Sequence, residues 1–175
     1  MKNTIGTSVQ LTVFGESHGP AVGVVLDGLA PGIPVDEAYV AGWLSRRRPC
    51  GRTDTARAEK DDFRILSGVR DGRTSGSPLT IVIPNSDVHA SDYAELENIA
   101  RPSHADFTAQ AKYHGFQDRS GGGHFSGRVT AGIVAAGAIC LKALEARGII
   151  VGTHILKCGG VCDAPFSDDC VPQIR

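Results

Sequence analysis

The sequence predicts a fold that combines β-hairpins with helices, and three features predict it. Apolar and polar residues alternate over 9–13, and a β-branched run follows over 22–26, which indicates two neighbouring strands. Two further strand candidates, 63–69 and 79–83, flank a loop rich in turn-forming residues. Small apolar residues over 130–146 predict the main helix. We expect one domain across all 175 residues, or half of a larger one.

A glycine-bounded segment, residues 15–20, is expected to connect the first two strands. It matches the G-x-S-x-G pattern of a hydrolase nucleophile elbow, which requires a strand, a sharp turn and then a helix. A β-branched run follows here instead, so this geometry is not expected at Ser17. His18 could present a proton donor near neutral pH, or it could be an ordinary solvated loop histidine.

The next element is a helix that begins at Pro34 and Asp36 and closes before Pro49. Its apolar residues share one face, and the basic run 46–48 lies at its C-terminal end. Neighbouring arginines can bind carboxylates and phosphate in a bidentate fashion. A run of charges can equally be a solvated face, and both interpretations stay open at this point.

A shorter helix is expected from Asp106 to Tyr113, after the segment Arg-Pro-Ser-His-Ala that contains His104. Asp106 could cap this helix or be a partner for His104. The Ser-Gly-Gly-Gly sequence at 120–123, here called the glycine loop, then leads toward the main helix. Such a loop suits a phosphate or a flavin, although glycine-rich turns also serve tight packing.

The end of the chain carries two further expectations. Residues 149–156 predict another strand, beyond the stop of the main helix near Gly148. Cys158, Cys162 and Cys170 cluster with His154 nearby, but their spacing is not that of a zinc ribbon. We therefore predict no metal site.

Composition argues against several classes of protein. Lys+Arg 18 against Asp+Glu 19 gives a net charge of -1, which favours neither a nucleic-acid nor a membrane partner. The longest apolar stretch, 131–144, falls short of the roughly 20 residues that span a bilayer. The polar N-terminus lacks the pattern of a signal peptide, so we expect a cytoplasmic protein with reduced thiols.

Taken together and in this order, the motifs resemble the chorismate synthase family. The segments that carry the resemblance are Phe14-Gly15-Glu16-Ser17-His18-Gly19, Asp27-Gly28, Pro31-Gly32-Ile33-Pro34, Arg46-Arg47-Arg48-Pro49, Ile65-Leu66-Ser67-Gly68-Val69, Arg101-Pro102, His104-Ala105-Asp106, Lys112-Tyr113 and Gly121-Gly122-Gly123 with Ser126 and Arg128. They extend over roughly residues 3–150, and several are longer than motifs that match by chance.

The resemblance implies an α+β fold, a layered sandwich of antiparallel sheets and helices, of which this chain would form about half. It implies an anti 1,4-elimination of phosphate from 5-enolpyruvylshikimate 3-phosphate, which yields chorismate for aromatic amino-acid biosynthesis. Family members require reduced FMN, can use NADPH as the flavin reductant, and form homotetramers.

The resemblance also assigns roles to individual residues. His18 matches the histidine that protonates the leaving phosphate, and His104 matches the histidine beside the reduced flavin. Arg47, Arg48 and Arg128 match the arginines that hold the anionic groups of the substrate. Positions that match cofactor contacts are Arg47 and Arg52 for the nicotinamide nucleotide, and His124, Phe125 and Ser126 for FMN. His124 and Phe125 depart from the residues usual in the family.

Family members are much longer, so we expect this chain to be a fragment that binds substrate without turnover. A non-catalytic anion- or flavin-binding module that uses the same arginines and glycine loop is the alternative. A serine hydrolase centred on Ser17 is a third hypothesis. Convergence of His18, His104, Arg48 and Arg128 in space would favour the synthase.

Overall fold

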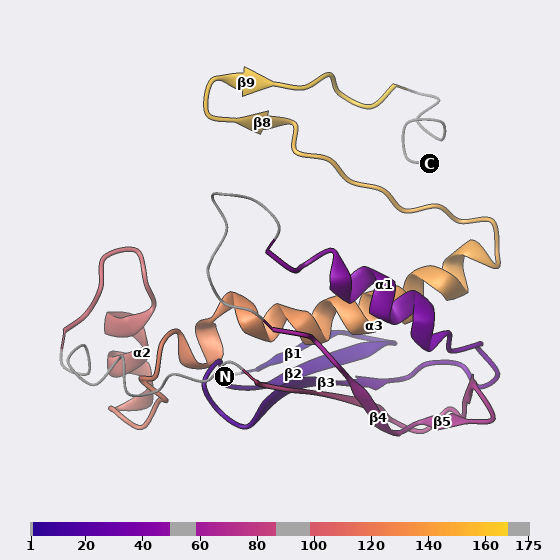
Figure 1. Ribbon diagram of the computed structural model, residues 1–175, viewed down its shortest axis with the longest axis horizontal. Coiled ribbons are helices and arrows are strands. Elements are labelled where there is room, and N and C mark those ends of the chain that lie inside the picture. Colours follow the sequence, from indigo (N-terminus) through magenta and orange to yellow (C-terminus); the bar gives the residue numbers. More distant parts are fainter. Residues whose placement is uncertain (1, 50–58, 87–98, 168–175) are drawn as a thin grey trace. The chain divides into compact units, whose positions relative to one another are not determined.

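The computed structural model describes residues 2–49, 59–86 and 99–167, and the chain divides into two compact units, Met1–Ile139 and Cys140–Arg175. The first unit contains a five-stranded antiparallel sheet with strand order β1-β2-β3-β7-β4 (Figure 1). Its strands are β1 (Thr4–Gly6), β2 (Gln10–Gly15), β3 (Ala21–Asp27), β4 (Arg64–Ser67) and β7 (Leu79–Pro84). The combination of this sheet with helices confirms the predicted α+β class.

The core lies on one face of the two central strands. Because side chains alternate across a strand, every second residue of β3 and β7 points to the same face. The three cross-strand pairs on that face are at most 1% exposed: Val22 with Ile83, Val24 with Ile81, and Leu26 with Leu79. This packing anchors the β2–β3 turn and the end of β7, where the candidate site lies.

Two helices lie on the same side of the sheet, α1 (Glu37–Ser45) and α3 (Thr130–Glu145), the latter followed here through Ile139 (Figure 1). The Asp36 carboxylate caps α1 by accepting a hydrogen bond from Tyr39 N at 3.0 Å. α3 approaches the sheet closely at Gly132, where a Cβ atom would lie 2.8 Å from the Gly23 carbonyl oxygen. Small residues on α3 therefore allow the helix to sit directly on β3.

The segment Gly127–Glu145 is long and apolar enough to cross a membrane by length and composition alone, although the sequence predicted no such segment. Its Ala131 and Ala135 are fully buried, and Gly132 packs against the backbone of β3. A helix whose small residues are buried against a sheet has the packing of a core helix. We interpret α3 in that way.

The predicted hairpin of 63–69 with 79–83 is confirmed as the β4–β7 pair. The connection between them contains two short paired strands, β5 (Val69–Arg70) and β6 (Arg73–Thr74). The helix predicted from Asp106 to Tyr113 is α2, with the same bounds. Between the glycine loop and α3 lie two 3₁₀ turns, η2 (Gly123–Phe125) and η3 (Gly127–Val129), so the loop does not feed the long helix directly.

The strand predicted over 149–156 is wrong, because these residues form no strand in the structure. The pairing begins just beyond them, between β8 (Lys157–Cys158) and β9 (Val161–Cys162). Apolar residues in the stretch are exposed: Ile149 by 49%, Val151 by 57% and Ile155 by 76%. β-Branched residues favour a strand where a partner strand and a buried face are available, and the described part of the chain gives this stretch neither.

Candidate functional site

The turn between β2 and β3, residues 16–19, packs against the glycine loop and is here called the His18 turn. Ser17 N donates to the Gly123 carbonyl oxygen at 3.0 Å, and Ser17 Oγ donates to the Ser120 carbonyl oxygen at 3.4 Å. Ser17 is 1% exposed and lies between two antiparallel strands. The expected strand-to-strand connection is confirmed, and it differs from the strand-to-helix elbow of a serine hydrolase.

His18 lies directly against the backbone of the glycine loop. Gly121 has φ +62°, and a Cβ atom at this position would lie 2.7 Å from both Cδ2 and Nε2 of His18. Glycine is therefore required at Gly121 for two reasons, the left-handed backbone and the space that the imidazole occupies. The loop thus sets the position of the His18 ring.

The His18 turn, the residues after α1 and the residues before α3 line a partly open cavity of about 390 Å³, here called the arginine cavity. Its lining residues are Ser17, His18, Arg47, Arg48, Pro49, Glu59, Asp61, Gly122, Ser126, Gly127 and Arg128. Three arginines face two carboxylates, so the lining keeps a net positive charge. Such a lining favours an anionic ligand.

Arg128 is 7% exposed, and each nitrogen of its guanidinium has a partner. Nε donates to Asn85 Oδ1 at 2.9 Å, and Nη2 donates to the Pro84 carbonyl oxygen at 3.2 Å. Nη1 forms a close ion pair with Asp61, and Glu59 Oε2 lies 3.9 Å from Nη2. A buried charge persists when it is paired and hydrogen-bonded, and Arg128 meets both conditions.

Asp61 bridges Arg128 to Arg47. Its carboxylate is 3% exposed, and its Oδ2 accepts from Arg47 Nη1 at 3.1 Å. Arg47 Nη2 also donates to the Gly127 carbonyl oxygen and to Thr130 Oγ1, each at 3.2 Å. Burial lowers the pKa of Arg47, and the charge of Asp61 opposes that effect. Asp61 adopts φ +56°, a left-handed conformation that Asp and Asn tolerate better than most residues.

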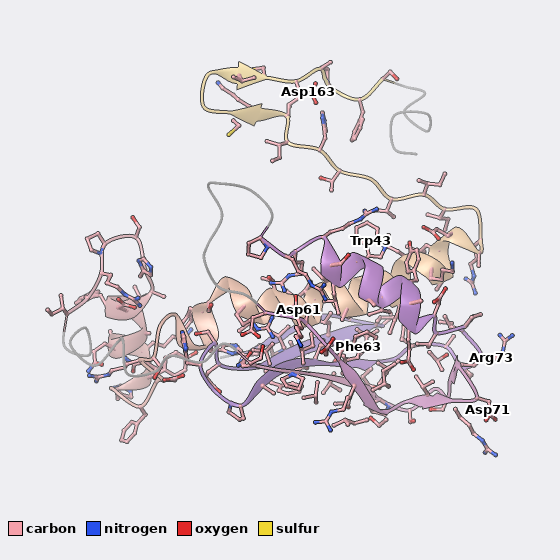
Figure 2. All side chains as sticks on the ribbon, in the orientation of Figure 1. Trp43, Asp61, Phe63, Asp71, Arg73 and Asp163 are labelled. Atoms are coloured by element: carbon pink, nitrogen blue, oxygen red, sulfur yellow. The ribbon has the colours of Figure 1, made fainter. Side chains whose placement is uncertain are left out.

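Arg48 is the more exposed arginine of the cavity, and its Nη2 donates to the Lys60 carbonyl oxygen. Figure 2 shows Asp61 between the helices and the sheet, away from Asp71 and Arg73 at one end of the sheet. The buried charges of the site are thus gathered where α1 and the start of α3 approach the sheet.

Sequence reasoning did not identify Glu59, Asp61 or Asn85. The signals were weak: two acidic residues after a basic segment, and an asparagine directly after the Pro84 that ends β7. Their partners lie far along the chain, since Asp61 and Arg128 are 67 residues apart. Local patterns do not show such pairings.

A second cavity of about 320 Å³ lies beside α2, here called the α2 cavity. Its lining residues include Arg101, Asp106, Phe107, Gln110, Arg119, Gly121, Gly122 and Phe125. Gly122 lines both cavities, so the glycine loop forms part of a shared wall.

The partner of Asp106 is Arg101. Arg101 Nε and Nη2 donate to the two carboxylate oxygens of Asp106 at 2.8 and 2.9 Å, and Nη2 also donates to the Gly121 carbonyl oxygen at 2.6 Å. These hydrogen bonds lower the pKa of Asp106 to about 2. Of the two roles predicted for Asp106, the helix N-cap is wrong, because Ala105 occupies that position. Its bidentate partner is Arg101, and His104 adds a weaker charge interaction.

The structure brings together three of the four residues whose convergence would favour the synthase: His18, Arg48 and Arg128 line the arginine cavity, as does Arg47. His104 is exposed, forms a hydrogen bond through Nδ1 with the Pro102 carbonyl oxygen at 3.0 Å, and lines neither of these cavities.

The predicted FMN contacts lie in three different settings. His124 Nδ1 lies 2.8 Å from the Gly15 carbonyl oxygen. Phe125 is 45% exposed and lines the α2 cavity. Ser126 lines the arginine cavity, where its Oγ accepts from Arg128 N at 3.2 Å. Arg52, predicted to contact a nicotinamide cofactor, lies outside the described residues.

The cysteine cluster is only partly described. Cys158 and Cys162 are exposed thiols, and Cys170 lies outside the described residues. His154 Nδ1 lies 3.1 Å from Asp163 Oδ2. Over residues 2–49, 59–86 and 99–167, no group of three or more His, Cys, Asp or Glu residues is placed to hold a metal ion.

Comparison with known proteins gives a consistent result. The family model described as chorismate synthase matches residues 9–173. Chorismate synthase of Thermococcus kodakarensis is 47% identical over 156 residues, 89% of this chain and 44% of that protein. The enzyme of the same name from Rhodospirillum centenum is 51% identical over 144 residues, 82% of this chain and 38% of that protein.

A solved structure described as "Crystal Structure of Chorismate Synthase" matches with a TM-score of 0.57 and 30% identity, over 81% of this chain and 36% of that chain. The chain therefore spans about two fifths of the length of the curated relatives that it matches, 44% and 38% for the two described above.

Proposed function

This chain belongs to the chorismate synthase family, and from that premise we propose that its arginine cavity binds 5-enolpyruvylshikimate 3-phosphate for conversion to chorismate. One observation carries the proposal. His18, Arg48 and Arg128 come from three distant segments and line the same positively charged cavity. The substrate is an anion with a phosphate and carboxylates, which arginine binds well.

The three arginines would have different roles in substrate binding. Arg128 and Arg47 are held by Asp61, so they act as fixed charges that face the ligand without reorganisation. Arg48 is exposed and donates to a single described main-chain oxygen, that of Lys60, so it is the arginine best placed to contact the phosphate directly.

His18 would donate a proton to the departing phosphate. In an anti 1,4-elimination a ring C–H bond breaks, its proton passes to a base, and its electron pair shifts the double bond along the ring. The C–O bond then breaks on the opposite face, and its electron pair leaves with the phosphate. A histidine is protonated to a useful extent near neutral pH and can supply a proton to the leaving oxygen. Contact with Gly121 fixes the ring at the wall of the cavity, which favours a defined direction of transfer.

The α2 cavity is our proposed site for reduced FMN, which when bound supplies an electron-rich partner for the substrate ring. Phe125 offers an apolar surface for a flat ring system, and Arg101 and Arg119 offer guanidinium groups to an anionic tail, although Asp106 and Asp118 in the same lining balance their charges. The assignments of His104 and His124 to flavin binding rest on family resemblance, since neither lines this cavity. NADPH as reductant, a homotetramer and a cytoplasmic location are further proposals from the family.

The test is anaerobic calorimetry of the 175-residue chain with 5-enolpyruvylshikimate 3-phosphate and reduced FMN, with chorismate followed by absorbance in the same samples. We expect Arg48→Ala to weaken substrate binding at least about tenfold, because a charge-assisted contact is lost. Arg70→Ala is the matched control, since Arg70 is 88% exposed and does not line the arginine cavity.

The outcomes separate the candidate functions. Binding with turnover would support the full reaction within this chain. Substrate binding without turnover that Arg48→Ala weakens would support a synthase fragment, as expected for a chain that covers two fifths of its relatives. Binding of FMN or of unrelated anions without preference for the substrate would support the anion- or flavin-binding module. A folded chain that binds neither ligand would contradict the proposal.

A further inference from the structure

Asn85 is hydrogen-bonded to Arg128 but is not among the residues that line the arginine cavity, and none of the steps proposed above uses it. It directly follows β7, and its backbone N–H donates to the Pro20 carbonyl oxygen at 3.1 Å. Its side chain is partly buried and forms hydrogen bonds with two separate parts of the site. These are the His18 turn and the guanidinium of Arg128.

On the side of the turn, Asn85 Nδ2 donates two hydrogen bonds. The acceptors are the carbonyl oxygens of Glu16, at 3.0 Å, and of Gly19, at 2.7 Å. These two residues bracket Ser17 and His18. The carboxamide therefore holds both ends of the turn that carries the proposed proton donor.

On the opposite side, Asn85 Oδ1 accepts from Arg128 Nε at 2.9 Å. This arrangement fixes the orientation of the amide, because the carbonyl oxygens require donors and Nε requires an acceptor. Aspartate can satisfy Arg128 but cannot donate to the turn. Alanine can do neither.

Ser86 provides an internal contrast to Asn85. Its Oγ donates to Glu59 Oε2 at 2.7 Å, which touches the carboxylate side of the cavity and not the His18 turn. Within the described residues, the side chain of Asn85 joins the His18 turn to Arg128 by hydrogen bonds on both sides. Neighbouring positions in the sequence thus serve different parts of the site.

We propose that Asn85 is a positioning residue that fixes the position of the His18 turn relative to the Arg128 guanidinium. His18, as proton donor, and Arg128, as cation, can then contact the same bound anion. The identification of that anion with the phosphate of the substrate rests on the proposed function. The link between turn and guanidinium rests on the hydrogen bonds alone, and the test separates the two.

The first arm measures hydrogen exchange by NMR in the ligand-free 175-residue chain. The probes are the Gly19 amide, which donates to Glu16 O within the turn, and the Nε–H of Arg128. Asn85→Ala should speed exchange at both by about tenfold relative to the amides of β3 and β7, as expected for the loss of a net hydrogen bond. Ser86→Ala should leave both at wild-type rates.

Asn85→Asp separates the two contacts. It should keep the Nε–H of Arg128 protected while the turn exchanges faster, because a carboxylate oxygen cannot donate to a carbonyl oxygen. Unchanged exchange at either probe in Asn85→Ala, after correction by the β3 and β7 amides, would overturn the proposal.

The second arm measures the pH profile of sulfate binding between pH 5.5 and 8, where sulfate itself does not titrate. In the wild type, sulfate affinity should fall as pH rises across this range, and His18→Gln should flatten this profile, because glutamine cannot carry the charge of a protonated imidazole. Asn85→Ala should flatten it too, while affinity at pH 8 stays within about threefold of wild type, since Arg47 and Arg48 remain.

A merely structural role of Asn85 would lower stability without changing the profile of the folded protein, so a wild-type profile in Asn85→Ala would overturn the proposal. If sulfate does not bind the wild type, the anion cavity of the proposed function is contradicted. The exchange arm then decides by itself whether Asn85 joins the turn to Arg128.

Discussion

Two guanidinium–carboxylate pairs flank the glycine loop and differ chiefly in burial. The side chains of Arg128 and Asp61, in the arginine cavity, are 5% and 3% exposed. Those of Arg101 and Asp106, beside α2, are 22% and 28% exposed. Gly121 joins the two regions, because its carbonyl oxygen accepts from Arg101 while its Cα faces the His18 ring.

The difference in burial changes how much stability is lost when one partner of an ion pair is removed. A buried ion pair gives little net stability, because desolvation offsets most of the attraction, but removal of one partner leaves an uncompensated charge. A partly exposed pair remains solvated after the same change and costs less. The inner pair therefore holds its charges fixed at the wall of the arginine cavity, and the outer pair supports the backbone of the loop. Four substitutions test this comparison.

The largest effect is expected for Asp61→Asn. Asparagine tolerates the φ of +56° at this position, so the change removes charge with little backbone strain. Arg128 and Arg47 then lose their shared carboxylate, and we expect the free energy of unfolding in urea to fall by about 3 kcal/mol. Sulfate should restore more stability to this variant than to the wild type. A loss below about 1 kcal/mol would contradict the distinction drawn from burial.

Gly121→Ala should rank second, since it disturbs the wall between the two regions. Strain at φ +62° and the contact of a Cβ with His18 should together cost about 2 to 3 kcal/mol. Gly72→Ala is the matched control, because Gly72 has φ +68° but no atom within 4 Å of a Cβ. In the same thermal or urea unfolding experiment, this variant should lose only the cost of the left-handed backbone conformation, about 1 kcal/mol of unfolding free energy. Equal losses would show that the imidazole does not pack tightly on the loop.

Asp106→Asn tests the outer pair through pH. The folded-state pKa of Asp106 is lowered to about 2 from its ordinary value of 3.8, so the folded state favours the charged form. That contribution is present above pH 4 and is lost as pH falls toward 2. Because the pair is partly exposed, we expect only about 1 kcal/mol, measured as the difference in unfolding free energy between pH 5 and pH 2.5. The variant should lose this part of the pH dependence, and an identical slope in both proteins would count against the pairing.

The smallest effect is expected for Asp71→Asn at one end of the sheet (Figure 2). Arg70 Nε lies 3.6 Å from Asp71 Oδ2, and the side chains are 88% and 91% exposed. Such pairs contribute almost nothing that can be measured, and asparagine accepts the φ of +51° found here. The urea midpoint should be unchanged. A clear shift of the urea midpoint would mean that side-chain exposure does not determine the ranking of the four substitutions.

Local pattern predicted much of the fold. The β2–β3 and β4–β7 hairpins and the bounds of α2 follow from alternation, turn residues and helix signals, all of which act over a few residues. The strand predicted over 149–156 fails for the converse reason: a strand depends on a partner, and the apolar residues of this stretch do not identify one.

The candidate site likewise contains residues that local sequence pattern predicts and residues that it does not. His18 and the arginines stand out in the sequence because histidine and arginine carry recognisable chemistry in glycine- and proline-rich surroundings. Asp61 and Asn85 do not, since their importance comes from contacts with Arg128, 67 and 43 residues further along the chain. Asp106 was recognised but its main partner was not, because the bidentate fit to Arg101 depends on the bend of the chain before α2.

The carboxylates inside the arginine cavity also bear on selectivity. Three arginines without Glu59 and Asp61 would attract any small anion, including the free phosphate abundant in cells. With two of those charges already balanced, an incoming anion meets a net charge close to +1, so a small anion such as sulfate binds through charge but more weakly than a ligand that also fills the cavity. Under the proposed function, discrimination then falls to the remainder of the substrate, whose ring and two carboxylates must match the shape of the cavity.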